Sequence, residues 1–238
     1  MKLTFQGRRV LLLGGSCDLG LALIPLLDAE GLEVFATAAS AHGRARLATL
    51  LPPERIYTVR LGEAESVWAL AENPPPVDYL VDLAHLREDD ALLLSLDPAK
   101  AQAAWMAMGA HRHRIVGALG RGMLARRFGR MLYVSSTAAA VPAPGQGLYS
   151  ALKRAAEGIY HTLGVELAGR GVSTVNLRLG LTQAGRGAAF LEHHPQLPWV
   201  SAEDAASCMV FLLSDQGLCI RLTSITVDAG LLARKYSS

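Results

Sequence analysis

This 238-residue chain has few cysteines, no long unbroken apolar run and almost no excess of positive over negative charge. Its three cysteines, Cys17, Cys208 and Cys219, are odd in number and lack metal-ligand spacing, so we expect a reducing compartment and no metal site. The net charge of +2 gives no indication of a nucleic-acid partner. The longest uncharged run, residues 131–152, contains prolines and glycines and is atypical of a membrane helix. No secretory signal pattern is evident at the start, which predicts a cytoplasmic protein with no membrane partner.

Apolar residues, in contrast, make up 51% of the chain and charged residues 18%, a composition that excludes intrinsic disorder. The length is close to that of one large α/β domain. Because no linker, internal repeat or block of like charges interrupts the sequence, we predict a single domain over residues 1–238.

Short apolar runs alternate with helical patterns along the chain. This alternation predicts right-handed βαβ crossovers, and therefore a Rossmann-like, doubly wound parallel sheet of about seven strands with helices on both faces. The predicted strands are 10–13, 34–37, 56–61, 77–83, 131–134, 172–179 and 225–227, and the predicted helices are 19–27, 44–51, 63–71, 98–126 and 146–167.

A glycine-rich turn, residues 14–20, follows the first predicted strand. Small residues there let backbone amides approach a pyrophosphate, and the next helix begins with partial positive charge. An ordinary strand-to-helix turn with Asp18 as a helix cap remains an alternative, because Asp18 puts a negative charge where a phosphate would bind. The residues predicted to contact a dinucleotide are Gly14, Ser16, Cys17, Asp18, Leu19 and Gly20.

The second predicted strand ends without the carboxylate that NAD-preferring sites place on the ribose hydroxyls. Thr37 and Ser40 stand there instead, with Arg44 and Arg46 shortly after. These side chains would accept a 2′-phosphate, which favours NADPH over NADH. An ordinary solvated loop is the alternative.

Ser136, Tyr149 and Lys153 form the strongest chemical pattern in the sequence. Tyr149 and Lys153 are spaced i, i+4 and therefore share one helix face. A free phenol has a pKa of about 10, and a nearby ammonium lowers it toward the range useful for general acid catalysis. We therefore predict Tyr149 as the acid, Lys153 as its activator and Ser136 as the group that orients a substrate carbonyl. The alternative is a surface helix that merely contains Tyr and Lys.

With these motifs the chain resembles the short-chain dehydrogenase/reductase family, and within it the 3-oxoacyl-[acyl-carrier-protein] reductases, over nearly its whole length. The resemblance implies NADPH-dependent reduction of a β-keto group, on a small molecule or on an acyl carrier protein, by a homo-oligomer (a dimer or tetramer). It further implies that Tyr149 and Lys153 contact the cofactor. Further implied positions are Ala84, Gly180 and Thr182 at the cofactor, and Arg127, Arg130 and Arg170 for docking of a carrier protein.

Several positions depart from the family pattern. Asp18 replaces a glycine, and Met108 aligns with the asparagine of the catalytic tetrad. The departures leave two alternatives open: a reductase of another small alcohol or ketone, and a partner-dependent subunit of a hetero-oligomer. His85 would flank the nicotinamide ribose or pack as a loop residue, and residues 111–114 are predicted to form a solvated or subunit-facing stripe. The other departures are Arg60, Asp82, Leu83, Leu179 and Ala184.

Overall fold

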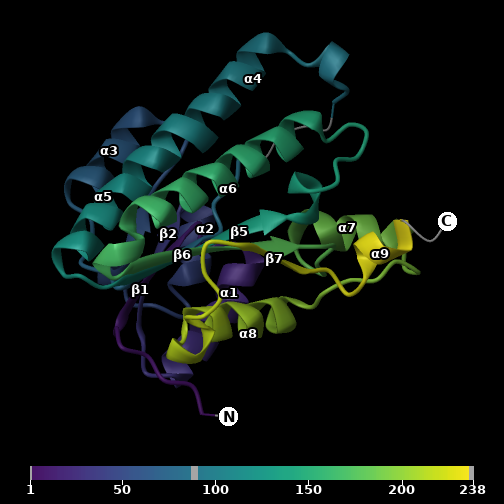
Figure 1. Ribbon diagram of the computed structural model, residues 1–238. Coiled ribbons are helices and arrows are strands. Elements are labelled where there is room, and N and C mark those ends of the chain that lie inside the picture. Colours follow the sequence, from purple (N-terminus) through teal and green to yellow (C-terminus); the bar gives the residue numbers. More distant parts are fainter. Residues whose placement is uncertain (1, 87–90, 236–238) are drawn as a thin grey trace.

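The computed structural model describes residues 2–86 and 91–235, and these build one seven-stranded sheet (Figure 1). The strand order is β3-β2-β1-β4-β5-β6-β7, and each neighbouring pair is parallel. The predicted doubly wound parallel sheet is therefore confirmed. The strands are β1 Arg9–Leu13, β2 Glu33–Ala38, β3 Ile56–Thr58, β4 Tyr79–Asp82, β5 Gly129–Ser136, β6 Val172–Leu179 and β7 Ser224–Val227.

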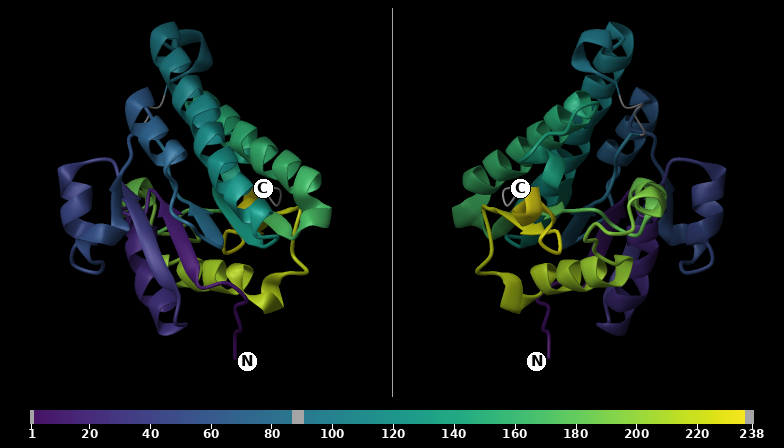
Figure 2. Two further views of the ribbon diagram at one scale, coloured as in Figure 1. Left: turned by 90° about the vertical axis from the view of Figure 1, so that its left-hand side faces the viewer. Right: turned by 90° about the vertical axis from the view of Figure 1, so that its right-hand side faces the viewer.

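Helices cover both faces of the sheet, as the two side views in Figure 2 show. Helices α1 and α8 pack against each other on one face, while α3, α5 and α6 lie on the other. The helices are α1 Asp18–Ala29, α2 Ala41–Leu47, α3 Ala64–Glu72, α4 Pro98–Trp105, α5 Arg112–Ala125, α6 Gly147–Leu167, α7 Gly185–His193, α8 Ala202–Leu213 and α9 Leu231–Lys235.

Strand β1 shows why its sequence is apolar at consecutive positions. Val10 and Leu12 belong to the hydrophobic cluster beneath α1 and α8, whereas Leu11 and Leu13 belong to the cluster beneath α3, α5 and α6. Burial of each such side chain stabilises the fold by about 1.5–3 kcal/mol. A central parallel strand thus needs apolar residues on both of its faces.

Two predicted helices differ from the structure. The helix predicted over 98–126 is interrupted by a π-helical segment, Met106–His111, between α4 and α5. Helix α2 begins earlier than predicted because Ser40 caps it, its hydroxyl accepting a hydrogen bond from the Gly43 amide. Helices α7, α8 and α9 were not predicted.

The order of the strands places a crevice between β1 and β4. The chain builds β1, β2 and β3 toward one edge and then returns to place β4 on the other side of β1. Loops that leave the carboxyl ends of β1 and β4 therefore diverge, which is where ligands bind in such sheets. Figure 1 shows α7 and α9 beyond the carboxyl ends of the central strands.

Candidate active site

A cavity of about 920 Å³ opens at the carboxyl ends of the strands. Its walls come from the glycine-rich turn, the loops after β4, β5 and β6, the start of α6, and α7 and α9. Cavities that hold small molecules measure about 300–1,000 Å³, so a dinucleotide-sized ligand is compatible with this volume. The predicted site residues that line it are Cys17, Asp18, Leu19, Ser136, Tyr149, Gly180 and Thr182.

Strand β5 and helix α6 bring the predicted catalytic residues together. Ser136 ends β5, and its Oγ accepts a hydrogen bond from the Ala138 amide at 3.2 Å. Lys153 is only 5% exposed, and its Nζ donates to the Val134 carbonyl oxygen at 3.0 Å. This bond holds the Lys153 Nζ 5.8 Å from the centre of the Tyr149 ring. The amine therefore faces the phenol ring, as the i, i+4 spacing predicts.

His85 lies in the loop after β4 and lines the same cavity. Its ring meets the Tyr149 ring edge-on, with the ring centres 4.8 Å apart. The structure thus places an imidazole against the predicted acid.

A buried ion pair fixes the loop that carries His85. Asp82 is fully buried and accepts hydrogen bonds from Arg112 Nη1 at 2.7 Å, from the Tyr160 hydroxyl at 2.8 Å and from the Ala84 amide at 3.0 Å. Arg112 Nη2 also donates to the Ala84 carbonyl oxygen. Burial alone would lower the pKa of Arg112, but the Asp82 carboxylate and the nearby Tyr133 and Tyr160 together outweigh it, and the pKa is raised. The loop is therefore held at both polar groups of the Ala84 backbone, the amide by Asp82 and the carbonyl oxygen by Arg112.

Arg112 was missed by sequence reasoning, which placed it in a solvated or subunit-facing stripe. It is fully buried, whereas the neighbouring His113 and Arg114 are exposed. The available signal was Asp82, because a carboxylate at the end of an apolar strand needs a cationic or hydrogen-bonding partner.

The glycine-rich turn packs tightly against the loop after β4. Gly14 has a φ of +78°, and a Cβ added to it would lie 2.7 Å from the Ala84 Cα. A Cβ on Gly20 would lie 2.2 Å from the Gly15 carbonyl oxygen, so α1 approaches the turn closely. The Gly14 amide donates to Thr37 Oγ1 at 2.7 Å. Thr37 is buried and supports the turn from β2.

Asp18 connects three elements at the mouth of this turn. Its carboxylate accepts a hydrogen bond from Arg46 Nη2 of α2 at 2.6 Å and from the Gly185 amide of α7 at 2.9 Å. The Arg46 contact holds the pKa of Asp18 below its ordinary value. A negative charge therefore persists beside the amides that would bind a phosphate.

The two arginines predicted near a 2′-phosphate point in different directions. Arg46 Nη1 donates to the Ser16 carbonyl oxygen, so Arg46 lies across the turn. Arg44 instead donates to the Ile56 carbonyl oxygen and holds α2 against β3. Ser40 caps α2 beside them.

The predicted docking arginines lie at the amino ends of β5 and β6, away from the carboxyl ends that border the cavity. Arg127 and Arg170 are exposed, and the Arg127 backbone packs against Gly171. Arg130 is only 1% exposed, and its Nη2 donates to the Gly217 and Ile220 carbonyl oxygens. Arg130 is therefore unavailable at the surface, contrary to its expected role.

Neither a metal centre nor a membrane segment is found in the part of the chain that the structure describes. Within residues 2–86 and 91–235, no group of three or more His, Cys, Asp or Glu side chains is placed to hold a metal ion. Within the same residues, no helix combines the length and apolar character needed to cross a membrane.

Comparisons with known proteins agree with this geometry. A sequence model of the family described as short chain dehydrogenase matches residues 8–194. The 3-oxoacyl-[acyl-carrier-protein] reductase FabG of Haemophilus influenzae is 27% identical over 240 residues, 95% of this chain and 98% of the relative. Carbonyl reductase [NADPH] 2 of Sus scrofa is 28% identical over 247 residues, 98% of this chain and 100% of the relative. A solved structure described as a short chain dehydrogenase/reductase family protein has a TM-score of 0.87 and 28% identity, covering 98% of this chain and 100% of its own.

Proposed function

This chain belongs to the short-chain dehydrogenase family of NAD(P)-dependent oxidoreductases, and on that premise we propose that it uses NADPH to reduce a β-keto group on an acyl thioester. The resemblance expected from the motifs is thereby confirmed at the level of the family. The observation that carries the proposal is the buried Lys153 amine, which faces Tyr149 in a cavity shared with Ser136 and the glycine-rich turn.

Three side chains handle the substrate carbonyl in this proposal. Ser136 Oγ donates a hydrogen bond to the carbonyl oxygen and orients it, and the Tyr149 phenol gives its proton to that oxygen. The positive charge of Lys153 stabilises the phenolate that remains. A nicotinamide dinucleotide held at the glycine-rich turn and by Lys153 would supply the hydride for this reduction.

The residues at the turn fit a dinucleotide in shape, with one electrostatic exception. The turn leaves no room for a Cβ at Gly14 or Gly20, so it packs closely against the loop after β4 and the start of α1. A turn of small residues of this kind supports binding of a pyrophosphate at its backbone amides. Arg46, which bonds to the turn, and Ser40, which caps α2, support the proposed preference for NADPH, because a cation and a hydroxyl there suit a 2′-phosphate. Asp18 is the exception, because its carboxylate repels the pyrophosphate.

The acyl-thioester substrate is supported by the relatives and by the two exposed arginines. One relative is named as a reductase of 3-oxoacyl groups on acyl carrier protein. Arg127 and Arg170 would contact an acidic carrier. Because they lie at the amino ends of strands whose carboxyl ends border the cavity, docking there suits a homo-oligomer in which the carrier serves another copy.

The test replaces the proposed acid. Tyr149→Phe removes only a hydroxyl, and we expect turnover of NADPH with an acetoacetyl thioester to fall about 10²–10⁴-fold while the circular dichroism spectrum stays unchanged. Tyr57→Phe, a half-buried tyrosine on β3, is the matched control and should keep full turnover. Equal turnover in wild type and Tyr149→Phe would refute the mechanism. NADPH consumption with a panel of small ketones and sugars distinguishes a thioester reductase from the alternative, a reductase of another small alcohol or ketone.

A partner-dependent subunit is the second candidate, and the Asp18 carboxylate at the turn is the observation that favours it. Met108 adds to it, since its buried thioether contacts Arg112 and offers no amide to hold a relay water. Calorimetric titration distinguishes the two. The isolated reductase binds NADPH, whereas the subunit binds neither NADPH nor NADH and gains activity only beside an active homologue.

A further inference from the structure

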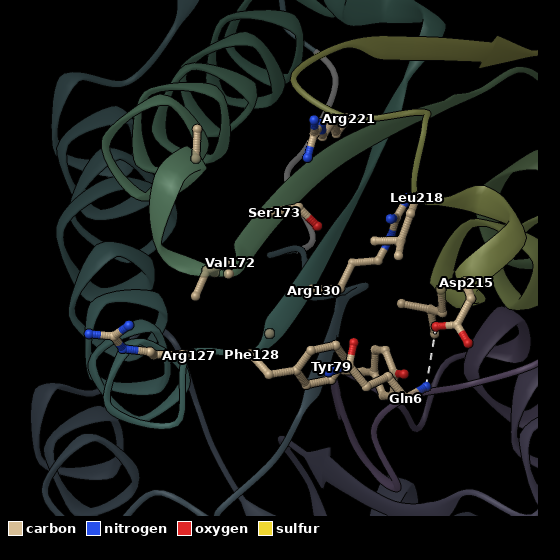
Figure 3. Close-up of a pocket in the computed structure, with 14 residues that line it drawn as sticks. Gln6, Tyr79, Arg127, Phe128, Arg130, Val172, Ser173, Asp215, Leu218 and Arg221 are labelled. Carbon is tan, nitrogen blue, oxygen red and sulfur yellow. Dashed lines mark hydrogen bonds between the residues drawn. The ribbon is translucent and has the colours of Figure 1, made fainter.

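A second cavity, of about 220 Å³, lies at the amino ends of β5 and β6 (Figure 3). Gly129 borders it, whereas Ser136 at the other end of β5 lines the active-site cavity. The seven steps along β5 from Gly129 to Ser136 rise by roughly 3.3 Å each, so these two residues are roughly 23 Å apart. The second cavity is therefore separate from the proposed site of reduction.

The floor of this cavity is a row of polar side chains across three strands. Tyr79 of β4 is paired with Arg130 of β5, and Arg130 is paired with Ser173 of β6. Paired residues on neighbouring parallel strands lie side by side on the same face, about 4.8 Å apart. Arg221, from the segment before β7, borders the same space in Figure 3.

The donors in this row are incompletely used. Arg130 Nη2 donates to two carbonyl oxygens, but Arg130 Nε and Nη1 have no hydrogen-bond partner among the residues that the structure describes. The buried Ser173 Oγ likewise has none within the described ranges. Three N–H groups and one hydroxyl thus lack a partner beside the cavity. All four are shielded as the side chains stand, so contact with a ligand requires a small rotation of the Arg130 and Ser173 side chains. Native proteins seldom leave buried donors unsatisfied, because each costs about 1–3 kcal/mol.

The charge around the cavity is positive. Arg127, Arg130 and Arg221 line it against one carboxylate, Asp215, which gives a formal excess of two positive charges. Burial, with a smaller contribution from Arg221, lowers the pKa of Arg130 to about 10, although Tyr79 and Asp215 oppose the shift. No ion pair of Arg130 is found among the described residues. A bound anion would accept hydrogen bonds from the unused donors and would reduce the repulsion between the arginines.

We propose that this cavity binds a phosphate group, either inorganic phosphate or a small phosphorylated metabolite, through Arg130, Ser173 and Arg221. A phosphate dianion matches the excess of two charges, and arginine donors suit phosphate oxygens. The volume equals that of about seven water molecules at about 30 Å³ each. It therefore admits a phosphate with a few further atoms and excludes a dinucleotide.

Inorganic phosphate is the probe for the test, with chloride held at equal ionic strength as the reference. We expect calorimetry to show one phosphate bound per chain, and binding should persist in saturating NADPH. Arg221→Gln and Ser173→Ala should each weaken it at least fivefold. Arg114→Gln, an exposed arginine on α5, is the matched control and should leave it unchanged.

Phosphate could also bind at the glycine-rich turn. The variant Arg46→Gln, measured in the same calorimetric titration, distinguishes the two binding sites. Binding at the second cavity survives Arg46→Gln, whereas binding at the turn is weakened. Three results would overturn the proposal. The first is no saturable phosphate binding, which would leave only water in the cavity. The second is loss of all phosphate binding in Arg46→Gln or in saturating NADPH, and the third is unchanged phosphate affinity in Arg221→Gln. Arg221 is exposed, so its replacement tests the site even if Ser173→Ala fails to fold.

Discussion

Replacing Asp18 should strengthen the binding of NADPH, although it removes contacts from the unliganded protein. The carboxylate joins Arg46 of α2 to the Gly185 amide of α7, directly at the turn where a pyrophosphate would bind. Asp18→Gly removes both contacts and the negative charge. It also leaves Arg46 available to a phosphate.

The size of the effect follows from the charges. Two like charges about 4 Å apart repel by about 1 kcal/mol in water and about 4 kcal/mol at an effective dielectric constant of 20. The Asp18 side chain is 43% exposed and Arg46 neutralises part of its charge, so the lower end of this range applies. A gain of about 1.4 kcal/mol corresponds to a roughly tenfold lower Kd for NADPH. Because the pKa of Asp18 is lowered, the effect should not vary with pH near neutrality.

Two measurements make this prediction specific. Fluorescence titration should give a tenfold lower Kd for Asp18→Gly, and an intermediate value for Asp18→Asn. Urea unfolding of the unliganded protein should show a loss of about 1 kcal/mol, as expected for a partly exposed ion pair at a helix start. Glu33→Gln, which weakens the partly exposed ion pairs with Arg9 and Arg55 at the amino end of β2, should leave the Kd unchanged. Weaker or equal binding by both Asp18 variants would refute the electrostatic argument.

Three further predictions concern the surrounding charges. Arg46→Gln should raise the Kd for NADPH about fivefold to tenfold more than the Kd for NADH, as measured by parallel titrations; an equal change in both would argue against a 2′-phosphate contact. Arg112→Met should lower the free energy of unfolding in urea by about 3–5 kcal/mol by leaving Asp82 buried and unpaired, and adding Asp82→Asn should restore most of it. Burial raises the pKa of Glu157, but the hydrogen bonds and positive charge of Arg178, together with hydrogen bonds from Ser135 and Ser224, outweigh it and hold the pKa below its ordinary value of 4.5. The stability from this pair is thus present above pH 4.5 and lost as pH falls through the lowered pKa, so Glu157→Gln should show a smaller loss of stability than wild type in acid urea titrations.

Local patterns predicted the parts of the structure that local forces determine. The apolar run of β1 and the i, i+4 spacing of Tyr149 and Lys153 each depend on neighbours in the sequence, and both match the structure. Helix α8 was not predicted, although its start carries a local signal: Ser201 caps it and acidic residues follow in its first turn.

Long-range partners could not be predicted in this way. Arg112 lies thirty residues from Asp82, and the bonds of Asp18 reach α2 and α7 across 28 and 167 residues. The exposure of Arg130 was misjudged for the same reason, because its partners lie 87 and 90 residues away. Only the three-dimensional arrangement shows whether a charged side chain faces water or another part of the chain.

The buried pair of Asp82 and Arg112 also limits how this sequence can change. Loss of either member leaves the other buried without its opposite charge, so a single substitution passes through a poorly folded intermediate. Descendants of this lineage should therefore keep both residues or exchange both together. We therefore expect the two positions to covary among close orthologues of this chain.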